Sequence, residues 1–235
     1  MSRYLTQLDD ELCWFPDPEH ALDEPNGLLA IGGDLSPARL LAAYHKGIFP
    51  WNEPHQPLLW WSPDPRGVVL PTQLHIGRSL RKFIRRTPFD ISIDRAFNEV
   101  IAACAAPRRS ASGTWISTPM IDAYRQLHRL GHAHSVEIWQ DGRLQAGLYG
   151  LSLGRVFCGE SMFSRIDNGA KLAMVALCQH FARHDGALID CQMQNDFLAT
   201  MGIEEWPRSK FLTTLTQLSR QPLAAGCWQA GSMTL

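Results

Sequence analysis

The chain of 235 residues is 45% hydrophobic and 19% charged, and its formal net charge at pH 7 is −1. This is the composition of a folded globular protein, and 8 Trp, 10 Phe and 4 Tyr exclude disorder as the dominant state. No apolar run approaches the roughly 18 to 20 residues of a membrane span, and the N-terminus lacks the pattern of a secretory signal, so we expect a cytoplasmic protein without a membrane partner.

Charge is distributed unevenly along the chain. Residues 1–64 hold three Lys or Arg and ten Asp or Glu, whereas residues 66–89 hold six basic residues and no acid. A basic cluster of this density is typical of a surface that neutralises phosphates. From charge alone, a solvated helix face is an equally good interpretation.

Proline indicates where one domain ends and the next begins. Six prolines between residues 50 and 71 predict an irregular connection, because proline at this density interrupts regular elements. We place the boundary near residue 64, which gives a small N-terminal domain over 1–64 and a larger domain over 65–235. In the small domain, Ser36 and Pro37 predict the start of a helix that Gly47 ends, and we expect loops around it.

The larger domain begins with three expected helices. They cover residues 78–86, 94–105 and 118 to about 131, where apolar side chains recur at a spacing of three or four. In the first of these, the basic residues occupy the side opposite the apolar ones. This arrangement predicts an amphipathic helix with an exposed cationic face.

A sheet is expected in the second half of the chain. Its strands are predicted at 135–139, 144–153, 155–160 and 187–192, with a largely buried helix at about 170–184 before the last strand. Asp141 and Gly142 tolerate the positive φ of a hairpin turn between the first two strands. Strands joined by hairpins and one crossover helix predict a mixed α/β domain of the α+β kind.

The common cofactor motifs are absent from the sequence. There is no GxxxxGK[ST], no GxGxxG and no GxSxG, which argues against nucleotide binding and against a hydrolase elbow. The six cysteines form no CxxC pair, and His132 and His134 have no acid or cysteine at ligand spacing. We therefore expect reduced, semi-buried cysteines, no metal and no cofactor.

Polar residues in apolar strands are the candidates for chemistry. Asp190 and Gln192 are two residues apart on the last predicted strand, so regular alternation would place them on one face. Glu160 ends a neighbouring strand in a similar setting. Buried polar groups are unfavourable unless they are hydrogen-bonded or functional, and both explanations stay open here. Several aromatic residues could likewise belong to the core or stack on bases: Phe49, Trp51, Trp60, Trp61 and Trp115.

Long blocks of the sequence resemble one known family. These blocks are GLLAIGGDLSPARLLAAYHKGIFPW (27–51), WWSPDPR (60–66), GTWIS (113–117), LGHAHSVE (130–137), FCGESMFSR (157–165) and LIDCQ with ND (188–196). They are similar to the bacterial leucyl/phenylalanyl-tRNA–protein transferases. The resemblance implies an N-terminal domain of unusual topology and a C-terminal domain related to the GCN5-type N-acetyltransferase fold. It also implies an activity without a cofactor, in which Leu or Phe (Met less readily) moves from aminoacyl-tRNA to proteins beginning with Arg or Lys and creates an N-degron.

The resemblance also implies roles for individual residues. Asp190 and Gln192 would be the catalytic pair, with Gln192 orienting the attacking amine, and Glu160 would recognise the cationic acceptor. Trp51 and Trp115 would surround the terminal adenosine of the tRNA. The amino-acid pocket would be lined by Leu148, Phe157, Met174, Phe181 and Ile189. The phosphates of the acceptor stem would be bound by Arg78, Arg81, Lys82, Arg85 and Arg86.

Two other functions remain as alternatives. A CoA-dependent N-acyltransferase would share the fold, but the expected pyrophosphate loop at residues 165–170 reads RIDNGA, with different spacing and an added acid. An RNA-binding module without catalysis would use the basic helix and the aromatic residues alone. It would leave Asp190, Gln192 and Glu160 without a purpose.

Overall fold

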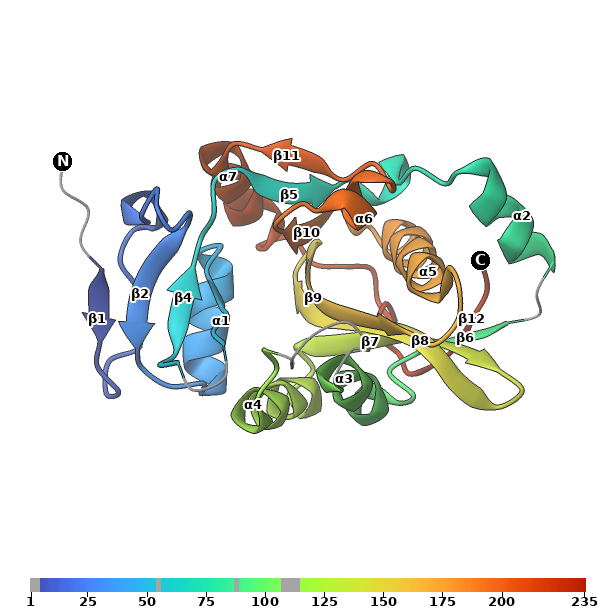
Figure 1. The fold of residues 1–235 in the computed structure, drawn as a ribbon, viewed down its shortest axis with the longest axis horizontal. Helices are drawn as coiled ribbons and strands as arrows, with labels where there is room; N and C mark the ends of the chain where they lie inside the picture. The colour runs from blue at the N-terminus through green and yellow to red at the C-terminus, as the bar shows by residue number, and fades with distance from the viewer. Residues whose placement is uncertain (1–4, 54–55, 87–88, 107–114) are drawn as a thin grey trace.

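The computed structural model describes residues 5–53, 56–86, 89–106 and 115–235, and its strands form two sheets (Figure 1). The small sheet has the order β1 (Thr6–Leu8), β2 (Leu28–Gly32), β4 (Leu59–Trp61) and β3 (Phe49–Pro50). The large sheet has the order β11 (Glu204–Trp206), β5 (Arg66–Val69), β10 (Leu188–Gln192), β9 (Val156–Ser164), β8 (Arg143–Leu153), β7 (Ala133–Gln140), β6 (Asp90–Ile93) and β12 (Gly231–Met233). Residue 64 lies in the connection between the two sheets.

The small domain corrects one prediction and confirms another. The helix α1 (Pro37–His45) begins after Ser36, whose hydroxyl accepts a hydrogen bond from the backbone N–H of Arg39. Around it, however, lies a four-stranded sheet with a short 3-10 turn, η1 (Pro18–His20), rather than loops alone. The strands were missed because they are only two to five residues long and because the LLAIG run of β2 shows no alternation.

The large sheet follows the predicted connections in its centre. β7 and β8 form an antiparallel hairpin, and its turn residues Asp141 and Gly142 have φ values of 51° and 69°. The helix α5 (Gly169–Arg183) links β9 to β10, which pair in parallel, and so is the predicted crossover. The two outer strands on each side of the sheet, β11 and β5 on one side and β6 and β12 on the other, were not predicted. β5 lies in the proline-rich segment that we expected to be irregular, and β11 and β12 have three residues each.

Helices cover both faces of the large sheet (Figure 1). α5 packs on one face, and α3 (Phe97–Ala105) and α4 (Thr118–Arg129) lie on the other. α2 (Arg78–Arg86) packs against α5, and the remaining helical segments are η2 (Pro71–Gln73), α6 (Asp196–Ala199) and α7 (Arg208–Leu218). These layers enclose two apolar clusters, one of which extends into the small domain. The predicted mixed α/β class is therefore confirmed.

The centre of the large sheet opens between β9 and β10. Their parallel pairing ends at Asp190 and Cys158, after which β9 continues to Ser164 without β10 beside it. On its other side, β10 pairs with β5 with a register shift between Asp190 and Gln192, and Gln192 has a φ of 61°. This irregularity breaks the alternation that we expected to place Asp190 and Gln192 on one face. The divergence of the strands creates room for a site.

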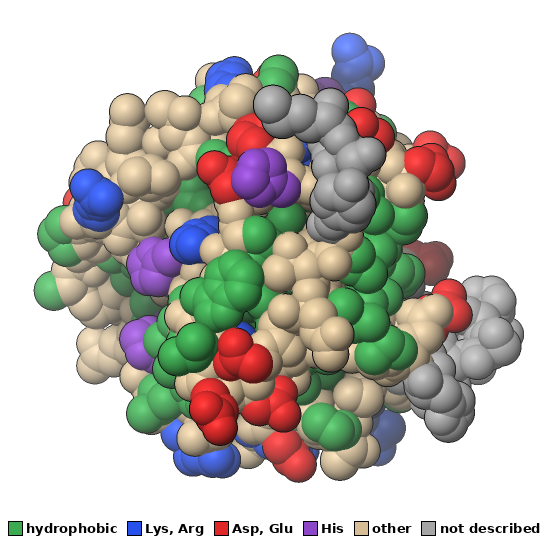
Figure 2. Space-filling model, turned by 90° about the vertical axis from the view of Figure 1, so that its left-hand side faces the viewer, with side chains coloured by type: hydrophobic (Ala, Val, Ile, Leu, Met, Phe, Trp, Pro, Cys, Tyr) green, Lys and Arg blue, Asp and Glu red, His purple; other side chains and the backbone are tan. Residues whose placement is uncertain are grey.

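The two ends of the molecule differ in charge. Figure 2 shows the small-domain end, where groups of acidic side chains lie among apolar and neutral surface. The basic helix α2 lies at the opposite end of the ribbon in Figure 1. Within the described ranges, no helix is both long enough and apolar enough to span a membrane.

Candidate active site

A large cavity lies where β9 and β10 diverge. Its volume is about 1340 Å³, and both domains contribute to its wall: Phe49 and Trp51 from the small domain, and Glu160 and Gln192 from the large one. Pockets for single small ligands occupy about 300–1,000 Å³. The cavity is therefore large enough for two reacting molecules side by side.

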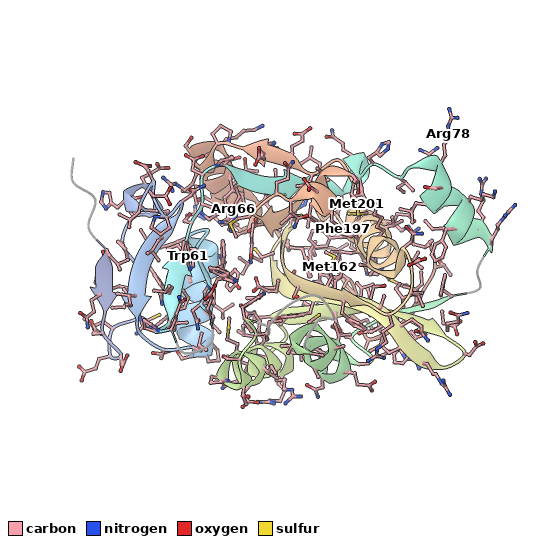
Figure 3. The ribbon with its side chains drawn as sticks, viewed as in Figure 1. Trp61, Arg66, Arg78, Met162, Phe197 and Met201 are labelled. Carbon is pink, nitrogen blue, oxygen red and sulfur yellow. The ribbon has the colours of Figure 1, made fainter. Side chains whose placement is uncertain are left out.

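Most of the predicted amino-acid pocket lines one part of this cavity. Leu148, Phe157, Met174 and Ile189 all belong to its wall. Phe181 is fully buried and lies behind the wall, with its ring centroid 6.1 Å from that of Phe157. Met162 on β9 and Phe197 on α6 add further apolar surface (Figure 3). The result is an apolar slot next to polar groups.

Behind the cavity, Arg66 and Asp190 form a buried ion pair. The guanidinium Nε and Nη2 donate to the two carboxylate oxygens at 2.8 and 2.7 Å, and both side chains are 1% exposed. Arg66 also donates to the Gly47 carbonyl at 3.0 Å and lies between the rings of Phe49 and Phe211. Both oxygens of Asp190 thus accept hydrogen bonds from Arg66. Arg66 is one of the six basic residues counted over 66–89, but it is buried and does not belong to the exposed basic surface (Figure 3).

Glu160 has a different environment. It is 9% exposed, and among the described residues it forms no ion pair. Its Oε1 accepts a hydrogen bond from Gln192 Nε2 at 2.8 Å, and its Oε2 accepts one from the Tyr124 hydroxyl at 2.8 Å. The Tyr44 and Tyr124 hydroxyls are 2.5 Å apart. Burial raises the pKa of Glu160 to about 8, and the nearby Asp190 charge adds to this effect.

Gln192 connects the two carboxyl groups. Its backbone N–H donates to Asp190 Oδ1 at 2.9 Å, while its side chain reaches Glu160. The carboxylate of Asp190 thus contacts Arg66 and the backbone of Gln192, whereas the side chain of Gln192 contacts Glu160. The amide Nε2 of Gln192 donates in that contact, and its Oε1 can still accept a hydrogen bond. A carboxyl group with a raised pKa beside an amide in a cleft is a typical functional arrangement.

Trp51 and Trp115 also belong to the cavity wall and are half-buried. Trp51 meets Trp61 edge to face at 5.6 Å between centroids, and its carbonyl accepts a hydrogen bond from Trp61 Nε1 at 2.6 Å. These contacts hold the Trp51 segment in place. Residues 113 and 114 of the GTWIS block lie outside the described residues.

The basic face of α2 is exposed, as the spacing predicts. Leu80 is buried, and Phe83 and Ile84 are partly buried against the apolar cluster beneath the helix. The exposed cations are Arg78, Arg81, Lys82, Arg85 and Arg86. Arg78 projects away from the body of the molecule in Figure 3. Such side chains are free to contact a large anionic partner.

Sequence reasoning missed three tyrosines at the site. Tyr44 and Tyr124 complete the hydrogen bonds around Glu160, and Tyr149 lines the cavity with a buried hydroxyl that has no hydrogen-bond partner within the described residues. All three occupy apolar positions of a helix or strand. Nothing in their spacing distinguishes them from core aromatics, so only the tertiary arrangement identifies them.

Comparisons with known proteins place the chain in a family. Among solved structures, it is similar to a GCN5-related N-acetyltransferase from Kribbella flavida, with a TM-score of 0.39 and 14% identity over 75% of this chain and 63% of that chain. The family model "Leucyl/phenylalanyl-tRNA protein transferase" matches residues 68–216, and the model of the N-terminal domain of the same family matches residues 33–64. Over the full length of both chains, the sequence is 92% identical to a leucyl/phenylalanyl-tRNA–protein transferase of Aeromonas hydrophila and 59% identical to one of Tolumonas auensis. The chain therefore belongs to the leucyl/phenylalanyl-tRNA–protein transferase family of enzymes.

Proposed function

We propose that the chain transfers Leu or Phe, and Met less readily, from aminoacyl-tRNA to the α-amino group of proteins that begin with Arg or Lys, which creates an N-degron. The observation that carries the proposal is an apolar slot that opens beside the Glu160–Gln192 contact. The slot suits an uncharged, elongated side chain. The carboxyl group next to it suits a cationic acceptor.

The donor would occupy the cavity and the surface that leads to α2. Its amino acid enters the slot, and its terminal adenosine stacks near Trp51 and Trp115. The exposed cations of α2 bind phosphates of the acceptor stem without reading its sequence. Membership of the family supports an aminoacyl-tRNA donor.

The reaction needs positioning more than activation. The ester that links the amino acid to ribose is already activated, so an amine can attack it without ATP or a covalent intermediate. The new C–N bond forms as the ester C–O bond breaks, and the amine proton ends on the ribose hydroxyl. Gln192 Oε1 accepts an N–H of the attacking amine, because its Nε2 is committed to Glu160. Asp190 is a positioning residue that acts through the backbone of Gln192.

Glu160 provides the negative charge for the acceptor. A cation that enters the cavity stabilises the ionised carboxyl group and so lowers its raised pKa. The binding energy of the acceptor therefore depends on ionisation of Glu160, which accompanies binding of the cation. Neutral N-terminal side chains lack this contribution, which favours Arg and Lys.

The test is a transfer assay with labelled aminoacyl-tRNA. Leu-tRNA and a peptide beginning with Arg should give a labelled peptide, ribonuclease should abolish the product, and excess acetyl-CoA should leave the rate unchanged. Phe-tRNA should react, whereas Val-tRNA and Asp-tRNA should react far more slowly. Acetylation of the peptide would favour a CoA-dependent N-acyltransferase. RNA binding without any transfer would favour a non-catalytic RNA-binding module.

A further inference from the structure

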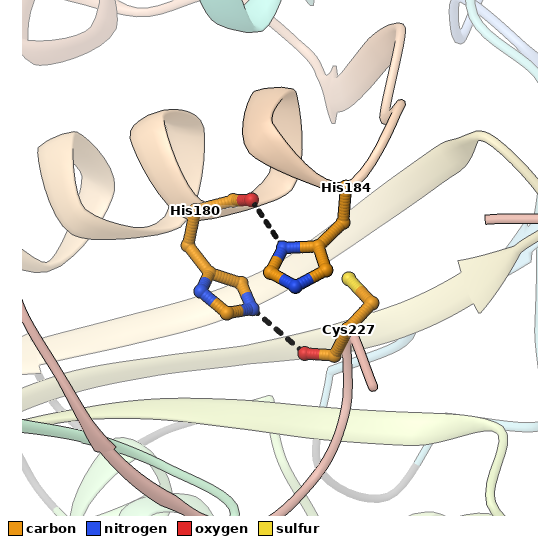
Figure 4. Close-up of side chains that lie close together, drawn as sticks. All are labelled: His180, His184 and Cys227. Carbon is orange, nitrogen blue, oxygen red and sulfur yellow. Dashed lines mark hydrogen bonds between the residues drawn. The ribbon is translucent and has the colours of Figure 1, made fainter. Parts of the chain in front are cut away.

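Outside the cavity, His180, His184 and Cys227 lie close together between α5 and the C-terminal segment (Figure 4). All three are residue types that can bind metal ions. His180 and His184 are four residues apart near the end of α5, so their side chains emerge on the same face of the helix. Cys227 comes from the segment that follows α7 and is 3% exposed. One ligand atom from each residue lies within 4.8 Å of the other two.

Hydrogen bonds fix the orientation and the tautomer of the two imidazole rings. His184 Nδ1 donates to the His180 carbonyl at 2.9 Å, which leaves the lone pair of His184 Nε2 free. The two ring centroids are 4.3 Å apart. His180 Nε2 donates to the Cys227 carbonyl at 2.7 Å, a bond that a metal on the same nitrogen would replace. The polar contacts thus already join the helix to the C-terminal segment.

We propose that His180, His184 and Cys227 form a binding site for Zn²⁺, a site that the transfer reaction does not use. Two imidazoles and a thiolate, with water in the fourth position, are a ligand set that this ion favours. Bond lengths of about 2.0 Å to nitrogen and 2.3 Å to sulfur place tetrahedral ligands about 3.5 Å apart. The observed separations of up to 4.8 Å must therefore shorten by about 1 Å when the ion binds.

Zn²⁺ binds the thiolate form of cysteine, so binding displaces the proton of the Cys227 thiol into solvent as the S–Zn bond forms. Burial of this thiol opposes its ionisation, and the free energy of the S–Zn bond has to offset that cost.

A second cluster could compete for the ion, but its polar atoms already form hydrogen bonds with each other and with the backbone. Asp94, His128 and His134 also place ligand atoms within 4.8 Å of one another. His134 Nδ1 lies 2.7 Å from Asp94 Oδ2, His128 Nδ1 lies 2.8 Å from the Ala133 carbonyl, and Asp94 Oδ1 accepts from the Ser135 N–H at 2.7 Å. These bonds join β7 to the segment after β6. We therefore assign the ion to the cysteine-containing cluster.

The proposed ion would fix a segment that supports the apolar slot. Trp228 follows Cys227, and its ring lies 5.5 Å from that of Phe157 and 5.8 Å from that of Phe181. Its Nε1 donates to the Ser152 hydroxyl at 2.9 Å. This segment lies beyond residues 68–216, which the family model matches. The ion would thus add stability at a part of the chain outside the matched region.

Calorimetric titration of the chelator-treated, reduced full-length chain with Zn²⁺ tests the proposal. We expect one equivalent to bind the wild-type chain, and Cys227→Ser and His180→Asn to bind at least about 10-fold more weakly, since even indirect ligand partners contribute about 10- to 100-fold. Cys13→Ser, which removes an exposed thiol, is the matched control and should bind normally. At a hundredfold excess over Kd, Zn²⁺ should raise the Tm of the wild-type chain by about 5–10 °C.

Substitution with Co²⁺ identifies the ligand directly. A thiolate–cobalt absorption band in the near ultraviolet should appear in the wild-type chain and in Cys13→Ser, and should vanish in Cys227→Ser. No binding of Zn²⁺, equal binding by Cys227→Ser, or a loss confined to His134→Asn would overturn the proposal. If Cys227→Ser fails to fold, His180→Asn decides: loss of the band in His180→Asn with its persistence in Cys13→Ser supports the site, and persistence of the band in His180→Asn refutes it. The result does not depend on transfer activity.

Discussion

Two buried carboxyl groups on neighbouring strands have opposite environments. Asp190 on β10 lies in the Arg66 region, where a guanidinium occupies both of its oxygens. Glu160 on β9 lies in the cavity region, where the donors to it among the described residues are the neutral groups of Gln192 and Tyr124. The charge of Asp190 is compensated within the protein. Glu160 has no cationic partner in the part of the chain that the structure describes.

This difference is the basis of the separate roles that we propose for the two acids. A buried ion pair with complete hydrogen bonds maintains structure, because either partner alone would be an uncompensated charge in the interior. A buried acid without a cation shifts toward its neutral form, as the raised pKa of Glu160 shows. Burial alone would have made the two residues look alike. Their partners distinguish the two residues, and on that basis we propose that Asp190 positions Gln192 and that Glu160 contacts the acceptor.

The largest expected effect is a loss of stability on removal of the Arg66 charge from the Arg66–Asp190 ion pair. Arg66→Met leaves the Asp190 carboxylate buried and unpaired, so the free energy of unfolding should fall by about 3–5 kcal/mol. Urea unfolding measures this loss. The double variant Arg66→Met/Asp190→Asn should recover part of it, because no unpaired charge remains.

Arg39→Met is the matched control for that variant. Arg39 is also 1% exposed, but its partner Asp34 is 38% exposed and can be solvated by water after the change. The loss of stability should therefore be clearly smaller than for Arg66→Met. Equal losses would mean that the Asp190 charge is not the source of the effect.

In the cavity region, removal of the charge should affect activity instead of stability. Glu160→Gln keeps the shape of the side chain, and kcat/KM for peptides beginning with Arg should fall about 10- to 100-fold, since a hydrogen bond to a charged group contributes about 1.5–3 kcal/mol. Unfolding measurements should show equal or greater stability at pH 7, because the variant has no carboxylate to bury.

Glu137→Gln provides the comparison for this experiment. Glu137 on β7 is a second buried carboxyl group with a pKa raised by burial, and it accepts hydrogen bonds from Ser92 on the neighbouring strand β6 and from Ser135 on its own strand. Because it does not line the cavity, its replacement should leave transfer unchanged. Loss of transfer in Glu137→Gln would show that burial of a carboxyl group, rather than its position, determines the effect.

The two regions should also differ in their response to pH. The pKa of Glu160 is about 8 in the folded chain against an ordinary value of 4.5, so its stabilising contribution is complete below about pH 4.5 and is lost as the pH rises toward 8. In the proposed function, the cationic acceptor binds the ionised form of Glu160. The KM for peptides beginning with Arg should therefore fall between pH 6 and pH 8, by up to about tenfold per pH unit.

The α-amino group of the peptide titrates in the same pH range and will also change KM. Comparison with Glu160→Gln separates the effect of Glu160 on KM from that of the α-amino group. The difference between the two KM profiles should level off above about pH 8. Parallel profiles for the wild-type chain and the variant would contradict the proposed role of Glu160.

The smallest change is expected far from both regions. Reversal of charge on α2 in Arg81→Glu/Arg85→Glu should weaken tRNA binding without a change in stability. The slope of log affinity against log salt concentration should become less steep by about 0.7 to 0.9 for each phosphate contact that is lost. Arg129→Glu/Arg143→Glu, at exposed positions on α4 and β8, gives the same change in net charge. Equal salt slopes in the two double variants would make α2 an ordinary solvated face.

The elements that could be predicted are those with strong local signals. The bounds of α2 agree with the prediction, and the β7–β8 hairpin and the β9–α5–β10 crossover have the expected order. The small sheet and β5 could not be predicted, because strands of two to five residues near prolines carry no periodicity. Cooperation between distant segments, rather than local preference, stabilises such strands.

The sequence by itself determined the mixed α/β class, the exposed basic face of α2 and, through its long matching blocks, the family. It also marked Asp190, Gln192 and Glu160 as polar residues in apolar strands. Only the tertiary structure decided which partners these three residues contact. The partners of Asp190 and Glu160, Arg66 and Tyr124, are 124 and 36 residues away along the chain, and a register shift turns Gln192 toward Glu160. Partners at such separations are set by how the sheets and helices pack, which no local pattern of residues encodes.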